Sequence, residues 1–76
     1  MSDYGVVLFY TSSAAMRAEA VLVRARVPVK LIPTPRQFSS DCGIALRFDW
    51  SQDYRVFVLL SELRVETAGI HQMSGR

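Results

Sequence analysis

The stretch VVLFY, residues 6–10, is an unbroken run of apolar side chains rich in β-branched and aromatic types. Such a run is typical of a strand covered on both faces, and therefore of a central strand in its sheet. Thr11, Ser12 and Ser13 follow and offer hydroxyl caps for a helix that we expect to run to about Ala25. One face of this helix carries small apolar side chains that would let it lie close to a sheet: Ala14, Ala15, Ala18, Val21, Leu22 and Ala25.

The next two segments have the alternating pattern of strands. Residues 27–32 alternate, but Pro28 and Pro33 cannot donate to a ladder, so we expect this strand at an edge of the sheet. Residues 43–48 alternate most clearly and predict a half-buried strand. Its two faces carry Ile44, Leu46 and Phe48 on one side and Ala45, Arg47 and Asp49 on the other.

A second helix is predicted from a cap at Ser51 to about Arg64. Its core stripe consists of Val56, Leu59, Leu60 and Leu63, and its outward side chains are Tyr54, Arg55, Ser61 and Glu62. Residues 56–58 alone also fit a strand because they are β-branched and aromatic. Residues 67–73 mix apolar and polar side chains, as an edge strand does.

The predicted order of elements is strand, helix, strand, strand, helix, strand. This is the order of the ferredoxin-like fold, an α+β βαββαβ sandwich with a four-stranded, mostly antiparallel sheet and two helices on one face. Its first and third strands are central, so the all-apolar strand falls in the middle and the proline-bearing strand at an edge. Residues 1–76 are expected to form one domain, because a chain of 76 residues is too short for two.

In this arrangement two groups of apolar side chains lie outside the predicted core between sheet and helices. The first is one face of the first strand, either Val6, Leu8 and Tyr10 or Val7 and Phe9. The second is a stripe on the outer side of the first helix, made of Met16, Ala20 and Val23. Each group is a candidate homodimer surface, and cover by loops or tails is the alternative.

The composition excludes several classes of partner. The net charge is only +2 and the basic residues are scattered, which argues against nucleic-acid and membrane-surface binding. No stretch approaches the roughly 20 apolar residues of a membrane span, and the first residues lack the basic start of a secretory signal. We therefore expect a cytoplasmic protein, and a lone cysteine fits a reducing compartment. One cysteine and one histidine cannot supply a usual zinc site, so we expect no metal and no cofactor.

The segment that carries chemistry is TPRQFSSD, residues 34–41, which joins the second and third strands and is followed by Cys42. Hairpin loops usually have about two to five residues, and longer loops are often functional. A guanidinium and aimed N–H groups favour the thiolate form that sulfur or selenium transfer requires. The alternative is that Cys42 is an inert small hydrophobe beside a buried strand. Arg36 and the donors of Ser39, Ser40 and Gly43 are suited to stabilise a sulfur anion, and Pro35 stiffens the entry of the loop.

Residues 31–48, LIPTPRQFSSDCGIALRF, resemble the segment IPxPRxxSSxCGxALRF of a family of short bacterial proteins called putative selenium/sulfur carrier protein-like. The resemblance extends over nearly the whole chain, including Phe9, Thr11-Ser12, Ala18-Glu19 and Leu22. It implies a carrier that holds sulfur or selenium on a cysteine as a persulfide or selenopersulfide, with donor and acceptor proteins as partners. Cys42 takes the position of the carrier thiol, and Pro35, Arg36, Ser39, Ser40 and Gly43 take the flanking positions.

One departure from the family pattern precedes the second strand, where relatives usually have a glycine and this chain has Arg26-Val27-Pro28. The departure questions how the first helix ends and leaves the thiol segment intact. We expect a carrier or accessory protein rather than an enzyme, because the chain has no second cysteine for disulfide exchange and only one histidine, His71.

The second interpretation is a non-covalent binding or regulatory module. Its Pro-Arg-Ser-Ser loop would receive a small anion or a partner's carboxylate, and Cys42 would be structural. His71 is then, as in the first interpretation, an ordinary polar residue of an edge strand. Phe38 is expected to anchor the loop to the core, and Trp50 to cover the sheet at the start of the second helix.

Overall fold

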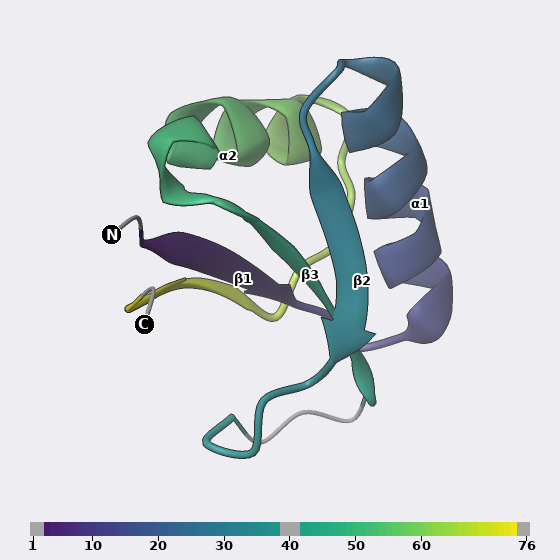
Figure 1. The fold of residues 1–76 in the computed structure, drawn as a ribbon. Helices are drawn as coiled ribbons and strands as arrows, with labels where there is room; N and C mark the ends of the chain where they lie inside the picture. Colours follow the sequence, from purple (N-terminus) through teal and green to yellow (C-terminus); the bar gives the residue numbers. More distant parts are fainter. Residues whose placement is uncertain (1–2, 39–41, 75–76) are drawn as a thin grey trace.

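The computed structural model describes residues 3–38 and 42–74. Its elements are β1 (Tyr4–Leu8), α1 (Ser12–Arg24), β2 (Val29–Pro33), β3 (Ile44–Asp49), a short 3₁₀ helix η1 (Trp50–Gln52), α2 (Asp53–Glu62) and β4 (Gly69–Met73). The sheet order is β2-β3-β1-β4, and neighbouring strands are antiparallel. Both helices cover one face of this sheet (Figure 1). The ferredoxin-like α+β fold is confirmed, with β1 and β3 central and the proline-bearing β2 at an edge.

The helix-facing side of the sheet carries the main core. Val7 and Phe9 point to this side together with Leu46 and Phe48 of β3, so the alternation predicted for residues 43–48 is confirmed. Thr11 caps α1 by accepting a hydrogen bond from the Ala14 amide at 3.1 Å. The buried residues of α1 are Ala15, Ala18 and Leu22, which belong to its predicted small-residue face. These small side chains let the helix pack directly on the sheet.

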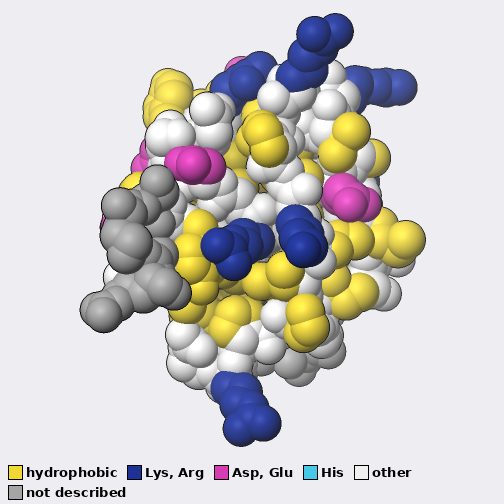
Figure 2. Space-filling model, in the orientation of Figure 1, with side chains coloured by type: hydrophobic (Ala, Val, Ile, Leu, Met, Phe, Trp, Pro, Cys, Tyr) yellow, Lys and Arg dark blue, Asp and Glu magenta, His cyan; other side chains and the backbone are white. Residues whose placement is uncertain are grey.

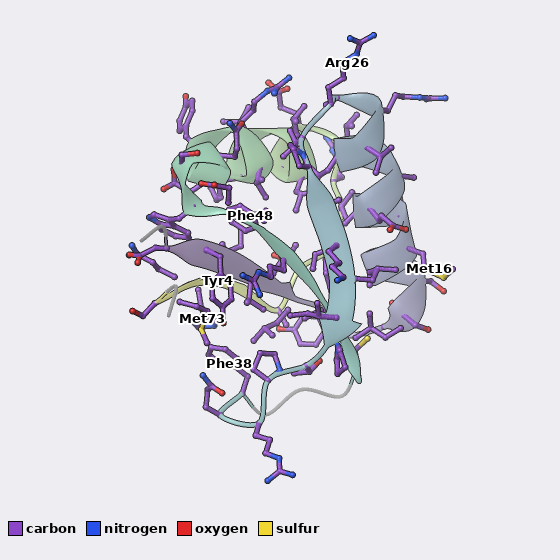
Figure 3. All side chains as sticks on the ribbon, viewed as in Figure 1. Tyr4, Met16, Arg26, Phe38, Phe48 and Met73 are labelled. Atoms are coloured by element: carbon purple, nitrogen blue, oxygen red, sulfur yellow. The ribbon has the colours of Figure 1, made fainter. Side chains whose placement is uncertain are left out.

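The opposite face of the sheet has a second, smaller cluster of buried side chains, made of Val6, Leu8 and Ala45. Phe38, from the loop between β2 and β3, is among the partly buried side chains that pack on it. Figure 3 shows Tyr4, Phe38 and Met73 on the side of the sheet opposite Phe48. Val6 and Leu8 are therefore the group of β1 that points away from the helices, and a loop supplies part of their cover. The stripe of Met16, Ala20 and Val23 on α1 stays exposed.

The strands are shifted from their predicted bounds for identifiable reasons. β1 covers residues 4–8 rather than 6–10, because the ladder with β3 and β4 starts at Tyr4, and Tyr10 is 51% exposed beyond its end. β2 starts at Val29 rather than at residue 27, because Val27 is buried in the turn that ends α1. β4 starts at Gly69 rather than at residue 67.

The prediction of one helix from Ser51 to Arg64 is wrong at both ends. Asp49 provides the cap, because its Oδ1 atom accepts from the Ser51 amide at 2.9 Å and starts η1, and α2 follows from Asp53. The helix ends at Glu62, so Leu63 falls outside the core stripe and is 48% exposed. Residues 56–58 are helical, which excludes the strand alternative.

Both helices end in the same way. Arg26 and Arg64 have positive φ angles of 64° and 56°. The amides that follow them reach back to carbonyls of the last turn, Val27 to Leu22 and Val65 to Leu60, each at 2.9 Å. These are Schellman motifs, and all four apolar side chains involved are buried. Arg26 therefore occupies a position that favours glycine. The chain forms the turn without the glycine of the family pattern, and the backbone of Arg26 is strained.

Replacing Arg26 by glycine is expected to stabilise the fold by about 1 kcal/mol, because the left-handed conformation is unfavourable for a residue with a Cβ atom. The Arg26 side chain extends away from the molecule, so little packing is lost (Figure 3). The measurement is the free energy of unfolding in urea. Arg24→Gly, inside the last turn of α1, is the control and should destabilise by about 1 kcal/mol. Equal destabilisation by both substitutions would contradict the prediction.

Asp49 gives the fold a dependence on acid pH. Its hydrogen bond from the Ser51 backbone holds the pKa of the carboxyl below its ordinary value of 3.8. A folded-state pKa that is lowered stabilises the fold above the unfolded value, and this stabilisation is lost as the pH falls through the folded-state pKa. We expect wild type to lose more stability than Asp49→Asn between about pH 5 and pH 2, measured by urea unfolding. Parallel pH profiles would contradict this.

Candidate functional site

The loop from β2 to β3 extends beyond one end of the sheet (Figure 1). Thr34 closes its base through two hydrogen bonds. The Thr34 amide donates to the Gly43 carbonyl at 3.0 Å, and the Thr34 hydroxyl donates to the Cys42 carbonyl at 2.9 Å. Thr34 therefore fixes the backbone of the cysteine from the other side of the loop. No role was predicted for Thr34, which stands between Pro33 and Pro35.

The tip of the loop is a turn from Pro35 to Phe38. The Phe38 amide donates to the Pro35 carbonyl at 3.0 Å, which places Arg36 and Gln37 at the centre of the turn. Pro35 is half-buried, and Arg36 is exposed. Among the residues that the structure describes, Arg36 makes no hydrogen bond or ion pair. Its charge is thus available to a molecule outside the chain.

Phe38 ties the loop to the open face of the sheet. Its ring stacks on the His71 imidazole of β4, with centroids 4.4 Å apart and planes at 26°. It also packs on the cluster of Val6, Leu8 and Ala45. The prediction that Phe38 anchors the loop is confirmed, and His71 acquires a packing role that the sequence did not indicate.

Cys42 lies at the far end of the loop, and its side chain is 5% exposed. It belongs to the core cluster on the helix side of the sheet, together with Phe9 and Ala15. The two ends of the loop therefore use opposite faces, with Phe38 on the open face and the thiol on the helix face. A reaction at the sulfur requires that this part of the loop moves away from the core.

Gly43 follows the cysteine and is exposed. Its φ is not positive, and a Cβ atom added at this position would have no heavy atom within 4 Å. Neither backbone strain nor crowding within the described chain therefore requires glycine here. Ser39 and Ser40, which the sequence analysis placed in the site, lie outside the described residues.

Residues 3–38 and 42–74 contain no group of three or more His, Cys, Asp or Glu side chains arranged to hold a metal ion. No helix in the same ranges is long and apolar enough to cross a membrane.

Comparison with protein families gives one result. The model of the family described as "Putative Se/S carrier protein-like" matches residues 4–72. The chain belongs to this family. The match runs from β1 into β4 and leaves out only Met73 of the helices and strands described above. Searches among curated proteins and among solved structures found no match.

In this Se/S carrier-like protein the structure brings only some of the predicted site residues together. Cys42 and Gly43 are joined to the start of the loop through Thr34, beside Pro35. Arg36 stands at the exposed tip, whereas the thiol is buried in the core. Thr34 and His71 hold the loop by contacts across 8 residues or more, which the spacing of the motif could not reveal.

Proposed function

We propose that this protein is a cytoplasmic carrier that holds sulfur or selenium on Cys42 and passes it to a partner protein. Membership of the Se/S carrier-like family supports the class of cargo. One observation supports the sulfur of Cys42 as the atom that holds the cargo. Cys42 is the chain's only cysteine and stands at the end of the loop that Thr34 closes. No other side chain of the protein can hold a sulfane sulfur as a persulfide.

The loading step is an exchange between thiolates. The Cys42 thiol first loses its proton to solvent, and its thiolate attacks the terminal sulfur of a donor protein's persulfide. A bond forms between the Cys42 sulfur and that terminal sulfur, while the donor's S–S bond breaks and its electron pair stays on the donor's cysteine as a thiolate. Selenium is transferred in the same way from a donor with an S–Se bond. No separate oxidant or reductant is consumed.

Loading requires that the loop opens, because Cys42 is buried in the helix-side core. Among the described residues, the contacts that oppose opening include the Thr34 hydrogen bonds and the Phe38 stack on His71. Opening of a loop held by such contacts costs much less than global unfolding. In this proposal a closed loop shields the cargo from solvent, and docking of donor or acceptor displaces it.

The test is intact-mass spectrometry after incubation with a cysteine desulfurase and cysteine, and separately with a reduced selenium donor. Wild type should gain one sulfur or one selenium atom, and Cys42→Ser should gain none. Absence of any adduct on wild type, under conditions in which the desulfurase itself becomes charged, would overturn the proposal.

Gly43→Ala tests whether partners approach the backbone beside the sulfur. The free energy of unfolding should change by less than about 0.5 kcal/mol, because the added methyl group meets open space. The rate of loading from the desulfurase should fall several-fold if the donor approaches this bare backbone, while alkylation by small iodoacetamide should stay at the wild-type rate. A loading rate equal to that of wild type would contradict the prediction.

A second candidate function is non-covalent binding of an anionic partner group at the loop tip. The observation that favours it is the exposed Arg36, which has no hydrogen bond or ion pair within the described chain. Arg36→Ala separates the two functions. If the protein is a carrier that uses this charge for docking, the substitution slows loading; if it is only a binding module, Cys42 remains unloaded in both variants.

A further inference from the structure

Two basic residues occupy neighbouring positions on adjacent strands, on the open side of the sheet. Lys30 of β2 is the direct register partner of Arg47 on β3. Their neighbours Leu31 and Leu46 belong to the helix-side core, so Lys30 and Arg47 point to the opposite, open face. Like charges directly opposite on adjacent strands destabilise a sheet. Figure 2 shows basic side chains in the middle of an apolar area, with acidic side chains farther out.

The nearby carboxylates of the described chain make hydrogen bonds to neutral donors instead of ion pairs with these two cations. Asp3 accepts a hydrogen bond from Gln72 Nε2 at 2.7 Å, and Asp49 accepts from the Ser51 amide at 2.9 Å. Within the described chain Lys30 and Arg47 make no ion pair with either. Lys30 on the outer strand β2 also discourages edge-to-edge pairing. That explanation does not extend to Arg47, because β3 is a central strand.

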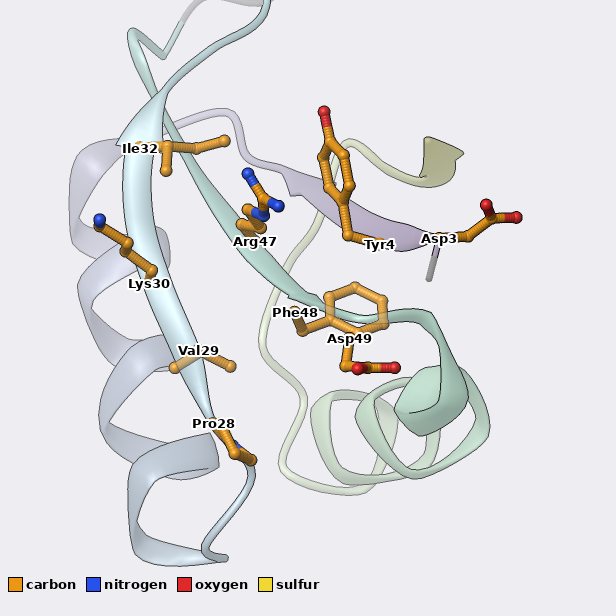
Figure 4. Close-up of a pocket in the computed structure, with 9 residues that line it drawn as sticks. All are labelled: Asp3, Tyr4, Pro28, Val29, Lys30, Ile32, Arg47, Phe48 and Asp49. Carbon is orange, nitrogen blue, oxygen red and sulfur yellow. The ribbon is translucent and has the colours of Figure 1, made fainter. Parts of the chain in front are cut away.

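The Arg47 guanidinium stacks on an aromatic ring. Its guanidinium carbon lies 3.8 Å from the centroid of the Tyr4 ring. A guanidinium stacked in this way keeps its N–H groups free around its edge, where they can bind an oxyanion with little loss of side-chain entropy. Figure 4 shows Tyr4, Arg47 and Lys30 rising from the three neighbouring strands β1, β3 and β2.

These side chains border a hollow of about 440 Å³. This volume is within the range of small-molecule sites. Besides the two cations, the lining includes the carboxylates of Asp3 and Asp49 and the side chains of Tyr4, Pro28, Val29, Ile32 and Phe48. The carboxylates of Asp3 and Asp49 point away from Arg47 (Figure 4). The part of the hollow beside Arg47 and Lys30 therefore offers two positive charges to a dianion, and the apolar lining matches an organic group attached to it.

We propose that this hollow binds a small phosphate monoester, with Arg47 and Lys30 on the phosphate and the organic group against Tyr4 and Ile32. The site is independent of Cys42, which lies on the other face of the sheet.

The test is an NMR titration of the full ¹⁵N-labelled chain with phenyl phosphate, inorganic phosphate or benzoate, each against sodium chloride at equal ionic strength. Phenyl phosphate should shift the amide signals of β2 and β3 saturably, with a dissociation constant on the order of millimolar. Inorganic phosphate lacks the apolar group, and benzoate has one negative charge rather than two, so both should bind more weakly.

Lys30→Gln and Arg47→Gln should each weaken binding about tenfold, the scale of one charge-assisted hydrogen bond. Arg24→Gln, which removes an exposed charge on α1, and Cys42→Ser should bind like wild type. Shifts that do not saturate, that chloride reproduces, or that persist in Lys30→Gln would overturn the proposal. Because Lys30 has no side-chain hydrogen bond or ion pair in the described chain to lose, this variant stays informative even if Arg47→Gln folds poorly.

Discussion

Gly5→Ala is expected to destabilise the fold by about 1 to 3 kcal/mol, the range for forcing an extra carbon into a packed core. Gly5 lies opposite Phe48 in the β1–β3 ladder. A Cβ atom at residue 5 would overlap the Phe48 ring, whose Cε2 atom would be only 2.8 Å away. The ring has little room to move, because it is 2% exposed and stacks near Trp50 with 6.0 Å between centroids. A domain of 76 residues has a total stability on the order of 4 to 11 kcal/mol, so this loss is a large fraction.

Urea unfolding of three variants measures this effect. Gly43→Ala is the matched control, because the same methyl group there meets open space. Adding Phe48→Leu to Gly5→Ala should recover part of the loss by removing the ring that the new methyl group strikes. Unfolding of Gly5→Ala at the same urea concentration as Gly43→Ala would show that the ring and β1 are not packed as described.

Phe38→Ala is expected to raise the rate of alkylation of Cys42 in the folded protein by about ten- to a hundredfold. The half-buried ring covers Val6 and Leu8 and stacks on His71. Loss of these contacts is worth about 1.5 to 3 kcal/mol. If the contacts are lost only from the closed loop, the open population rises by the corresponding factor.

The measurement is the rate of iodoacetamide labelling at fixed pH, with a urea curve of each variant to subtract global unfolding. Phe57→Ala is the matched control, because Phe57 is 58% exposed on α2 and far from the loop in the chain. Equal labelling rates for Phe38→Ala and Phe57→Ala would mean that the Phe38 anchor does not govern access to the thiol.

Much of the fold was predictable because its signals are local and repeated. The apolar run at residues 6–10, the two prolines around β2 and the alternation from Ile44 to Phe48 each indicated a place in the sheet, and all agree with the observed order. The ends of α2 were not predictable in this way. They depend on Asp49 reaching the Ser51 amide and on a Schellman turn that excludes Leu63 and buries Val65 in its stead.

The residues of the candidate site were predictable from the sequence, but their arrangement in space was not. The motif identified the loop and its cysteine, but periodicity does not reveal which face of the sheet a loop residue reaches. That Cys42 turns to the helix side while Phe38 turns to the open side follows from long-range contacts with Thr34 and His71. The opposed pair of Lys30 and Arg47 likewise depends on the register between β2 and β3.

The central claim is that Cys42 accepts the cargo atom, and an isotope experiment tests it most directly. The protein is incubated with a cysteine desulfurase and cysteine that carries a heavy sulfur isotope, and the tryptic peptide of residues 37–47 is then analysed by mass spectrometry. We predict one heavy sulfur atom on Cys42 and its loss when an acceptor thiol is added. A peptide that stays free of heavy sulfur, while the desulfurase carries it, would contradict the carrier function.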